Sequence, residues 1–145
     1  MKSAIIITLS VLTLSSVAQA GELPSGQQLQ IIAEQKTQMV DTKTLAEMLD
    51  NELDMVLVDI RTADEIRNMN GSIKATQNKN IPRGWLEYRI QKLAISKDTP
   101  IVVYCGAGLR SPFAAETLQK MGYTNVKNYS EGYFGWKKAG LPIAP

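Results

Sequence analysis

The alternation of short apolar segments with amphipathic ones constrains the fold of this chain most. Met55 to Ile60 and Ile101 to Tyr104 are apolar runs with many β-branched residues, and Val126 to Tyr129 is a third candidate strand. Candidate helices lie around them at residues 44–49, 63–69, 85–95 and 112–121. Apolar strands that alternate with helices are typical of a parallel sheet covered on both faces. We therefore expect an α/β, three-layer sandwich with a central, mainly parallel sheet of about five strands flanked by helices.

Local signals predict where some of these helices begin and end. Thr44 with Glu47 three residues later is typical of a capping box. Pro112 in the first turn and Gly122 at the end predict a helix from 112 to 121. A weak helical pattern in the Gln-rich segment 21–40 predicts a leader or first helix, and residues 136–139 predict a closing helical turn.

Two scarce residue types exclude several kinds of site. The 145 residues include no histidine, so a Ser-His-Asp triad, a Cys-His dyad and a histidine-ligated zinc are excluded within the chain. They include one cysteine, which excludes an internal disulfide, a C-x-x-C pair and a thiolate metal cluster. The formal charge of +2 is too small to indicate a nucleic-acid partner.

The first twenty residues are typical of a secretory signal peptide. Lys2 precedes an apolar stretch from Ala4 to about Val17, and Ala18 and Ala20 are small residues suited to a cleavage site. We expect cleavage after Ala20, a periplasmic or secreted location, and no membrane association after cleavage. The predicted organisation is a signal peptide at 1–20, a leader segment at 21–41 and a single domain at 42–145.

The segment between the second apolar run and the predicted helix at 112 contains the candidate reactive residues. Cys105 is followed by Gly106, Ala107, Gly108, Leu109, Arg110 and Ser111. Glycines allow such a loop to curl so that its N–H groups form an anion site at the helix N-terminus, and an arginine adds positive charge. A cysteine held there is expected to be a thiolate without help from histidine. The alternative is a buried, inert cysteine at the end of a core strand.

Several ordered motifs make the chain resemble the single-domain rhodaneses, a family of sulfurtransferases, and in particular exported, periplasmic members of the phage-shock type. The resemblance runs from about Thr42 to Pro142. Its motifs are Val58-Asp59-Ile60-Arg61 with Glu65, Gly71-Ser72-Ile73, Asn80-Ile81-Pro82, Tyr104-Cys105 to Arg110-Ser111, Gly122-Tyr123 with Asn125-Val126, and Gly132 with Trp136 and Gly140-Leu141-Pro142.

The resemblance implies a rhodanese-like fold and transfer of a sulfane sulfur. Cys105 is the implied catalytic residue: it takes sulfur from thiosulfate or a similar anionic donor and holds it as a persulfide for a thiol or cyanide acceptor. Substrate binding is implied for Arg110, which orients the donor, and for Gly106, Ala107, Gly108, Leu109 and Ser111. No cofactor is implied beyond the covalent persulfide, and a protein is a further candidate acceptor of the sulfur.

Other functions remain open from the sequence. Neutral Gly106 and Ala107 weaken the expected binding of a doubly charged donor, so a partner-fed persulfide carrier or binding module with little thiosulfate activity is the main alternative. A phosphatase is a third option, but the four residues between Cys105 and Arg110 form a shorter loop than the five that Cys-dependent phosphatases use. Asp59 with Arg61, and the two tryptophans Trp85 and Trp136, are expected to serve packing more than the site.

Overall fold

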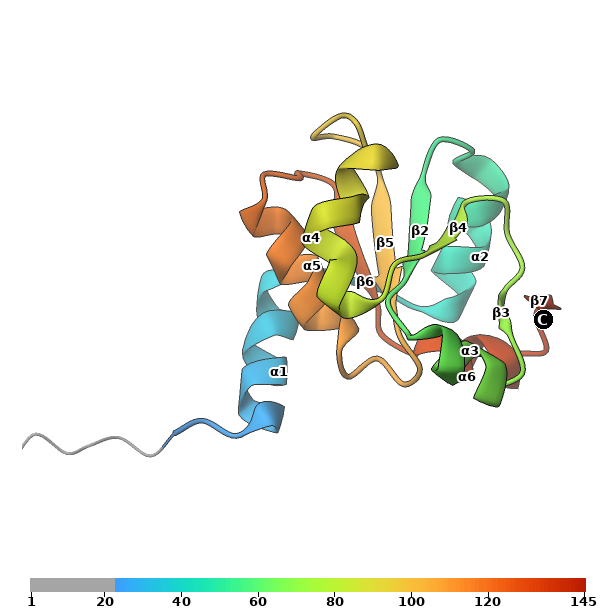
Figure 1. Cartoon of the computed structure of the whole chain (residues 1–145), viewed down its shortest axis with the longest axis horizontal. Helices are drawn as coiled ribbons and strands as arrows, with labels where there is room; N and C mark the ends of the chain where they lie inside the picture. The colour runs from blue at the N-terminus through green and yellow to red at the C-terminus, as the bar shows by residue number, and fades with distance from the viewer. Residues whose placement is uncertain (1–22) are drawn as a thin grey trace, which may run out of the picture.

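The computed structural model describes residues 23–145 and contains a five-stranded parallel sheet in the order β1-β6-β5-β2-β4 (Figure 1). The expected α/β fold with a central parallel sheet of about five strands is confirmed. The predicted signal segment, residues 1–20, lies outside the described residues. The strands are Gln38–Val40 (β1), Val56–Asp59 (β2), Asn78–Asn80 (β4), Ile101–Tyr104 (β5) and Val126–Tyr129 (β6).

Helices cover both faces of this sheet (Figure 1). Helices α4 and α5 pack on one face and α2 and α6 on the other, while α1 lies along the outer side of α5. The helices are Gly26–Lys36 (α1), Thr42–Asn51 (α2), Ala63–Asn68 (α3), Leu86–Arg89 (α4), Ser111–Lys120 (α5) and Gly132–Lys138 (α6), with single 3-10 turns at Arg83–Trp85 (η1) and Ile90–Lys92 (η2).

Alternating side chains of the central strands build a core on each face. In β5, Ile101 and Val103 join the core under α4 and α5, whereas Val102 and Tyr104 join the core under α2 and α6. Because successive side chains of a strand point to opposite faces, a strand buried on both sides must be apolar throughout. This is why the apolar runs of the sequence correspond to the central strands.

Some expected elements differ in the structure. Helix α2 begins at Thr42 and is capped by Asp41, whose carboxylate accepts from the Thr44 N–H at 2.8 Å, so the capping box expected at Thr44 is wrong. The expected first helix ends at Lys36, and Met39 lies in strand β1 instead. The segment 85–95 is broken into η1, α4 and η2, and the closing turn is the seven-residue helix α6.

A second, two-stranded sheet completes the fold. Strands Ser72–Ile73 (β3) and Ile143–Ala144 (β7) form a small antiparallel pair that ties the end of the chain to the segment after α3. Among residues 23–145, none of the helices combines the length and the hydropathy needed to cross a membrane.

Candidate functional site

Cys105 lies directly after β5, at the edge of the sheet where the parallel strands end. The cysteine loop, which we define as residues 105–110, connects β5 to α5, and α5 begins at Ser111. Cys105 is only 1% exposed, and its Sγ lies 3.8 Å from the Oγ of fully buried Ser111. The Cys105 thiol donates to this hydroxyl. Since a hydroxyl can rotate and donate instead, Ser111 is also placed to donate to a deprotonated sulfur.

The backbone of this segment has many free donors. Within residues 23–145, none of the six successive N–H groups from Gly106 to Ser111 has a hydrogen-bond acceptor. Half of these six residues, Gly106, Gly108 and Ser111, are buried. Buried N–H groups are ordinarily paired, so unpaired donors on buried residues beside a cysteine are a feature that an anion would satisfy. The N-terminus of α5 adds its positive dipole end at the same place.

Helix α6 fixes the direction in which two of these donors point. The N–H groups of Tyr133 and Phe134 donate to the carbonyl oxygens of Cys105 and Gly106, at 2.8 and 2.9 Å. The C=O and N–H of a trans peptide point in opposite directions, and the described chain contains no cis peptide. The N–H groups of Gly106 and Ala107 therefore point away from α6.

Two glycines allow this close approach. Gly108 has φ +76°, and a Cβ atom there would lie 1.8 Å from the Ser130 carbonyl oxygen. Gly132, the first residue of α6, has φ +60°, and its Cβ would lie 2.7 Å from the carbonyl oxygen of Gly106 and 2.8 Å from that of Cys105. A side chain at either position would strain the backbone and push the loop away from its support.

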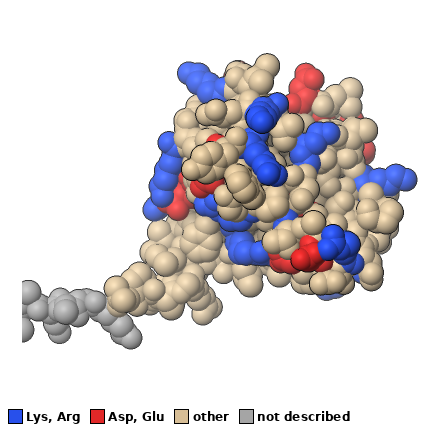
Figure 2. All heavy atoms as spheres, in the orientation of Figure 1, with Lys and Arg blue, Asp and Glu red and all other residues tan. Residues whose placement is uncertain are grey.

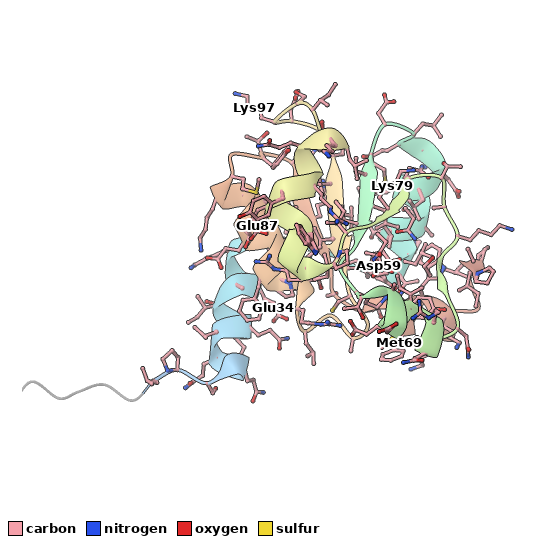
Figure 3. The ribbon with its side chains drawn as sticks, viewed as in Figure 1. Glu34, Asp59, Met69, Lys79, Glu87 and Lys97 are labelled. Carbon is pink, nitrogen blue, oxygen red and sulfur yellow. The ribbon has the colours of Figure 1, made fainter. Side chains whose placement is uncertain are left out.

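The rim of the loop is largely apolar. Leu109 is 57% exposed and Phe134 of α6 is 50% exposed, and Ala107 is also exposed. A Cβ at Gly106 would lie within ordinary contact of the Met69 methyl group, at 3.4 Å, and of the Phe134 ring, at 3.8 Å. Met69 follows α3, at the end of the molecule where α3 and α6 meet (Figure 3).

Arg110 does not extend freely from the loop. Its guanidinium donates to both oxygens of Glu65 in α3, with Nη2–Oε1 at 2.5 Å and Nη1–Oε2 at 3.2 Å. The hydrogen bonds from Arg110 are the main reason why the pKa of Glu65 falls from 4.5 to about 2, and the same bonds raise the pKa of Arg110. Both groups are therefore charged at neutral pH and form a two-pronged ion pair beside the cysteine.

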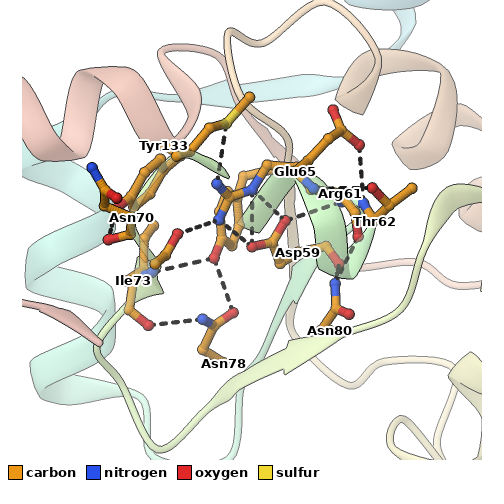
Figure 4. A network of polar contacts seen from close by, with 12 residues as sticks. Asp59, Arg61, Thr62, Glu65, Asn70, Ile73, Asn78, Asn80 and Tyr133 are labelled. Carbon is orange, nitrogen blue, oxygen red and sulfur yellow. Dashed lines mark hydrogen bonds and ion pairs between the residues drawn. The ribbon is translucent and has the colours of Figure 1, made fainter. Parts of the chain in front are cut away.

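A second, buried ion pair joins Arg61 to Asp59 (Figure 4). Arg61 is fully buried and donates to Asp59 through Nε, at 2.9 Å, and Nη2, at 2.6 Å. It also donates to the carbonyl of Gly71 and to the Met69 sulfur, and lies 4.2 Å from the centre of the Tyr133 ring. Burial lowers the pKa of Arg61, but the bonds to Asp59 outweigh it, so the pKa is raised overall.

These contacts make Asp59 and Arg61 structural, as expected. The pair holds the end of β2, the Gly71 turn and Met69 together. Trp136 is buried and donates to the Pro142 carbonyl at 2.8 Å, which also agrees with a packing role. Trp85 is exposed and lies against Tyr88 and Arg89 instead of the core.

The groups that reach the cysteine loop from elsewhere are not predicted by the sequence. Glu65 belongs to a motif that assigns it no role at the site, and no sequence pattern connects Gly132, Phe134 or Met69 with Cys105. The contact between Glu65 and Arg110 joins residues 45 positions apart, which no local pattern reveals. Within residues 23–145, no three carboxylate or cysteine side chains are grouped so that they could hold a metal ion.

Known proteins resemble this chain in sequence and fold. The family described as the Rhodanese-like domain matches residues 41–139. A sulfurtransferase from Allochromatium vinosum is 36% identical over 104 residues, which cover 72% of this chain and 92% of the relative.

Two solved structures share the fold as well. The polysulfide-sulfur transferase homodimer from Wolinella succinogenes has a TM-score of 0.71 and 28% identity, covering 80% of this chain and 84% of that chain. A protein of unknown function from Rhodopseudomonas palustris, described as a possible tyrosine phosphatase, has a TM-score of 0.74 and 29% identity, covering 86% and 97%. Since the family match spans more than half of the sequence and includes the cysteine loop, the chain belongs to the rhodanese-like domain family, whose members here include sulfurtransferases.

Proposed function

We propose that this protein transfers a sulfane sulfur from thiosulfate or a similar anionic donor to a thiol or cyanide acceptor, through a persulfide on Cys105. One observation carries the proposal: the only cysteine of the chain is followed by six successive N–H groups without an acceptor among residues 23–145. Such donors stabilise negative charge on a sulfur and on its bound donor without any proton transfer. A chain without histidine is suited to that chemistry.

The proposed first step needs no acid or base. The Cys105 thiolate attacks the outer sulfur of thiosulfate, a new S–S bond forms, and the S–S bond of the donor breaks. The bonding electron pair leaves with sulfite, and the negative charge of the outer sulfur stays on the persulfide. In the second step an acceptor thiolate or cyanide attacks the outer persulfide sulfur, and the electron pair returns to Cys105.

The loop residues have separate roles in this proposal. The N–H groups of Gly106 to Ser111 and the Ser111 hydroxyl bind the thiolate and persulfide charge, and Arg110 faces the anionic part of the donor. Gly108 permits the backbone turn, and Leu109 and Ala107 form the rim. No cofactor takes part in either step.

The test follows the mass of the chain. Native protein and the Cys105→Ala variant are incubated with thiosulfate and then with cyanide, and each is weighed by intact mass spectrometry. We expect the native chain to gain one sulfur atom that cyanide removes as thiocyanate, and the variant to gain none. Failure of the native chain to gain sulfur from any donor, while its thiol remains reactive to iodoacetamide, would overturn the proposal.

A persulfide carrier fed by a partner protein is the second candidate. It is favoured by the pairing of Arg110 with Glu65, which leaves less positive charge for a small dianion. In that case the chain accepts sulfur from a protein persulfide and passes it to another thiol with little turnover of thiosulfate. Hydrolysis of an aryl phosphate that depends on Cys105 would instead favour a phosphatase, which the short loop disfavours.

A further inference from the structure

Glu65 is the group outside the cysteine loop that most directly changes its charge. The loop contains one charged side chain, Arg110, and both of its terminal nitrogens are bound by Glu65. The Glu65 carboxylate also accepts from the Thr62 N–H at 3.0 Å, so α3 holds it in place through a capping box. The two charges are therefore fixed against each other, and their fields largely cancel at a distance.

Of three other cations, only Arg83 is bound by a carboxylate, whereas Lys79 and Lys137 donate to backbone carbonyls, which carry no net charge. Arg83 is bound by Glu87 and by Thr117 of α5, and Lys79 donates to the Thr76 carbonyl. Lys137 donates to the Met69 carbonyl at 3.3 Å. Figure 2 shows the acidic side chains near its lower edge, where Figure 1 places α3, lying among basic ones instead of beside a patch of one sign.

The rim adds an apolar surface beside the Arg110–Glu65 pair. Leu109 and Phe134 are each about half exposed, and Met69 and Phe134 flank Gly106. Such side chains gain free energy by covering an apolar group of a ligand, whereas they offer nothing to the oxygens of thiosulfate. Charge and hydropathy at the loop therefore favour the same kind of donor.

We propose that Glu65 is a positioning residue that restrains Arg110 and cancels much of its charge, so that the site prefers sulfane donors with a single negative charge and an apolar leaving group. Organic thiosulfonates and persulfides are donors of this class. The inference rests on the proposed sulfurtransferase function and names its substrate class. For a thiosulfonate, the Cys105 thiolate bonds to the outer sulfur, the S–S bond breaks, and the electron pair leaves with the sulfinate.

The test replaces Glu65 with its neutral isostere. Glu65→Gln removes the charge but keeps an oxygen for the Thr62 N–H, because glutamine also serves in a capping box. Asp64→Asn is the matched control, since Asp64 is the neighbouring acidic residue of α3 and pairs with Arg67 on the exposed side. Formation of the Cys105 persulfide is followed with thiosulfate, a dianion, and with benzenethiosulfonate, a monoanion.

The expected result is a selective gain for the dianion. Because Coulomb energies scale with the product of the charges, we expect Glu65→Gln to speed the thiosulfate reaction roughly tenfold and the benzenethiosulfonate reaction roughly threefold. Asp64→Asn is expected to leave the ratio of the two rates unchanged. The double variant Glu65→Gln with Arg110→Gln should not show the faster thiosulfate reaction, because the positive charge that Glu65 cancels in the native chain is then absent. Equal gains for both donors, or none, would overturn the inference.

Two further measurements separate this inference from the proposed function and test the rim. Alkylation of Cys105 by iodoacetate relative to neutral iodoacetamide reports the local charge even if no donor is ever used, and this ratio should rise in Glu65→Gln. An unchanged alkylation ratio contradicts the inference whether or not sulfur is transferred.

In the native chain, benzenethiosulfonate should react faster than methanethiosulfonate, and equal rates would contradict the apolar part of the proposal.

Discussion

Two arginines show, at the scale of single residues, how burial decides what a charge does. Arg61 is fully buried and its donors are taken up by Asp59, Gly71 and Met69, so its charge is used for structure. Arg110 is 45% exposed at its side chain and meets a partner that is itself partly exposed. A buried pair is costly to break, whereas an exposed pair contributes little stability. The Arg110–Glu65 pair can therefore be altered by substitution at a small cost in stability, whereas the Arg61–Asp59 pair cannot.

Glu65 gives a prediction about pH and stability. Its pKa is about 2 in the folded protein against an ordinary 4.5, chiefly because Arg110 donates to it. A lowered pKa in the fold means that the stabilisation is present above pH 4.5 and is lost as the pH falls toward 2. Since the pair is partly exposed, we expect Glu65→Gln to cost about 1 kcal/mol at pH 7.

Urea unfolding of native protein and Glu65→Gln, at several values between pH 7 and pH 2.5, checks this. The difference in free energy of unfolding should stay constant down to about pH 5 and then shrink toward zero, where both chains carry a neutral group at this position. Asp64→Asn controls for loss of an acidic side chain from the same helix. A difference that is independent of pH contradicts the assigned pairing.

At the scale of elements, helix α6 supports the cysteine loop from outside. Its first N–H groups bind the Cys105 and Gly106 carbonyls, and only a glycine at position 132 lets the two backbones approach so closely. Gly140, at the other end of the helix, also has a positive φ, of +68°, but a Cβ there would meet nothing within 4 Å. The two positions share a positive φ but differ in their surroundings.

We therefore predict different outcomes for alanine at these two glycines. Gly132→Ala should lower the free energy of unfolding by about 2 kcal/mol or more and slow persulfide formation strongly, because the new methyl group displaces the loop. Gly140→Ala should cost about 1 kcal/mol through backbone strain alone and leave persulfide formation unchanged. Thermal or urea unfolding together with intact mass measures both effects. Normal sulfur uptake by a folded Gly132→Ala variant would show that α6 does not position the loop.

Elements that their own residues specify are predicted well from the sequence, whereas elements that depend on pairing with distant segments are not. β2 and β5 are apolar throughout because both faces are buried, and α5 carries its own proline and glycine signals, so local sequence predicts them. β1 and β4 are short edge strands with polar residues such as Gln38 and Asn78, and only pairing with β6 and β2 makes them strands. The expected helix at 85–95 failed because apolar spacing alone does not reveal breaks between short turns.

The candidate site likewise has a part that the sequence predicts and a part that only the fold reveals. The cysteine loop is contiguous, and its glycines, arginine and position before a helix were visible in the sequence. The contributions of Glu65, Gly132 and Phe134 depend on packing between elements that are far apart along the chain. A motif can mark such residues as notable, but only the fold shows which atoms they contact.

At the scale of the whole molecule, parallel topology explains why these distant groups meet. Glu65 follows β2, Cys105 follows β5 and Gly132 follows β6, and these three strands are neighbours that all end at the same edge of the sheet. In such sheets the carboxyl edge is where ligands bind. The short pair β3 and β7 and the buried Arg61 network close the same end of the molecule, which keeps the supports of the loop in place.

The segment before this fold gives the last prediction. We propose that residues 1–20 direct export and are removed after Ala20, because Lys2, an apolar stretch and two small alanines form the pattern that signal peptidases recognise. Helix α1 begins at Gly26 with Ser25 as its cap, so this cut leaves every described element intact. A single cysteine also allows folding in an oxidising compartment without disulfide errors.

Expression of the full chain in a Gram-negative bacterium, followed by fractionation and N-terminal sequencing, tests the export proposal. We expect periplasmic protein that begins at Gly21, and a mass equal to that of residues 21–145. Ala20→Leu should block processing, because a large residue does not fit the cleavage position, and should retain the longer chain at the membrane. Recovery of the uncut native chain from the cytoplasm would refute the assignment, while leaving the chemistry of Cys105 to be judged by its own test.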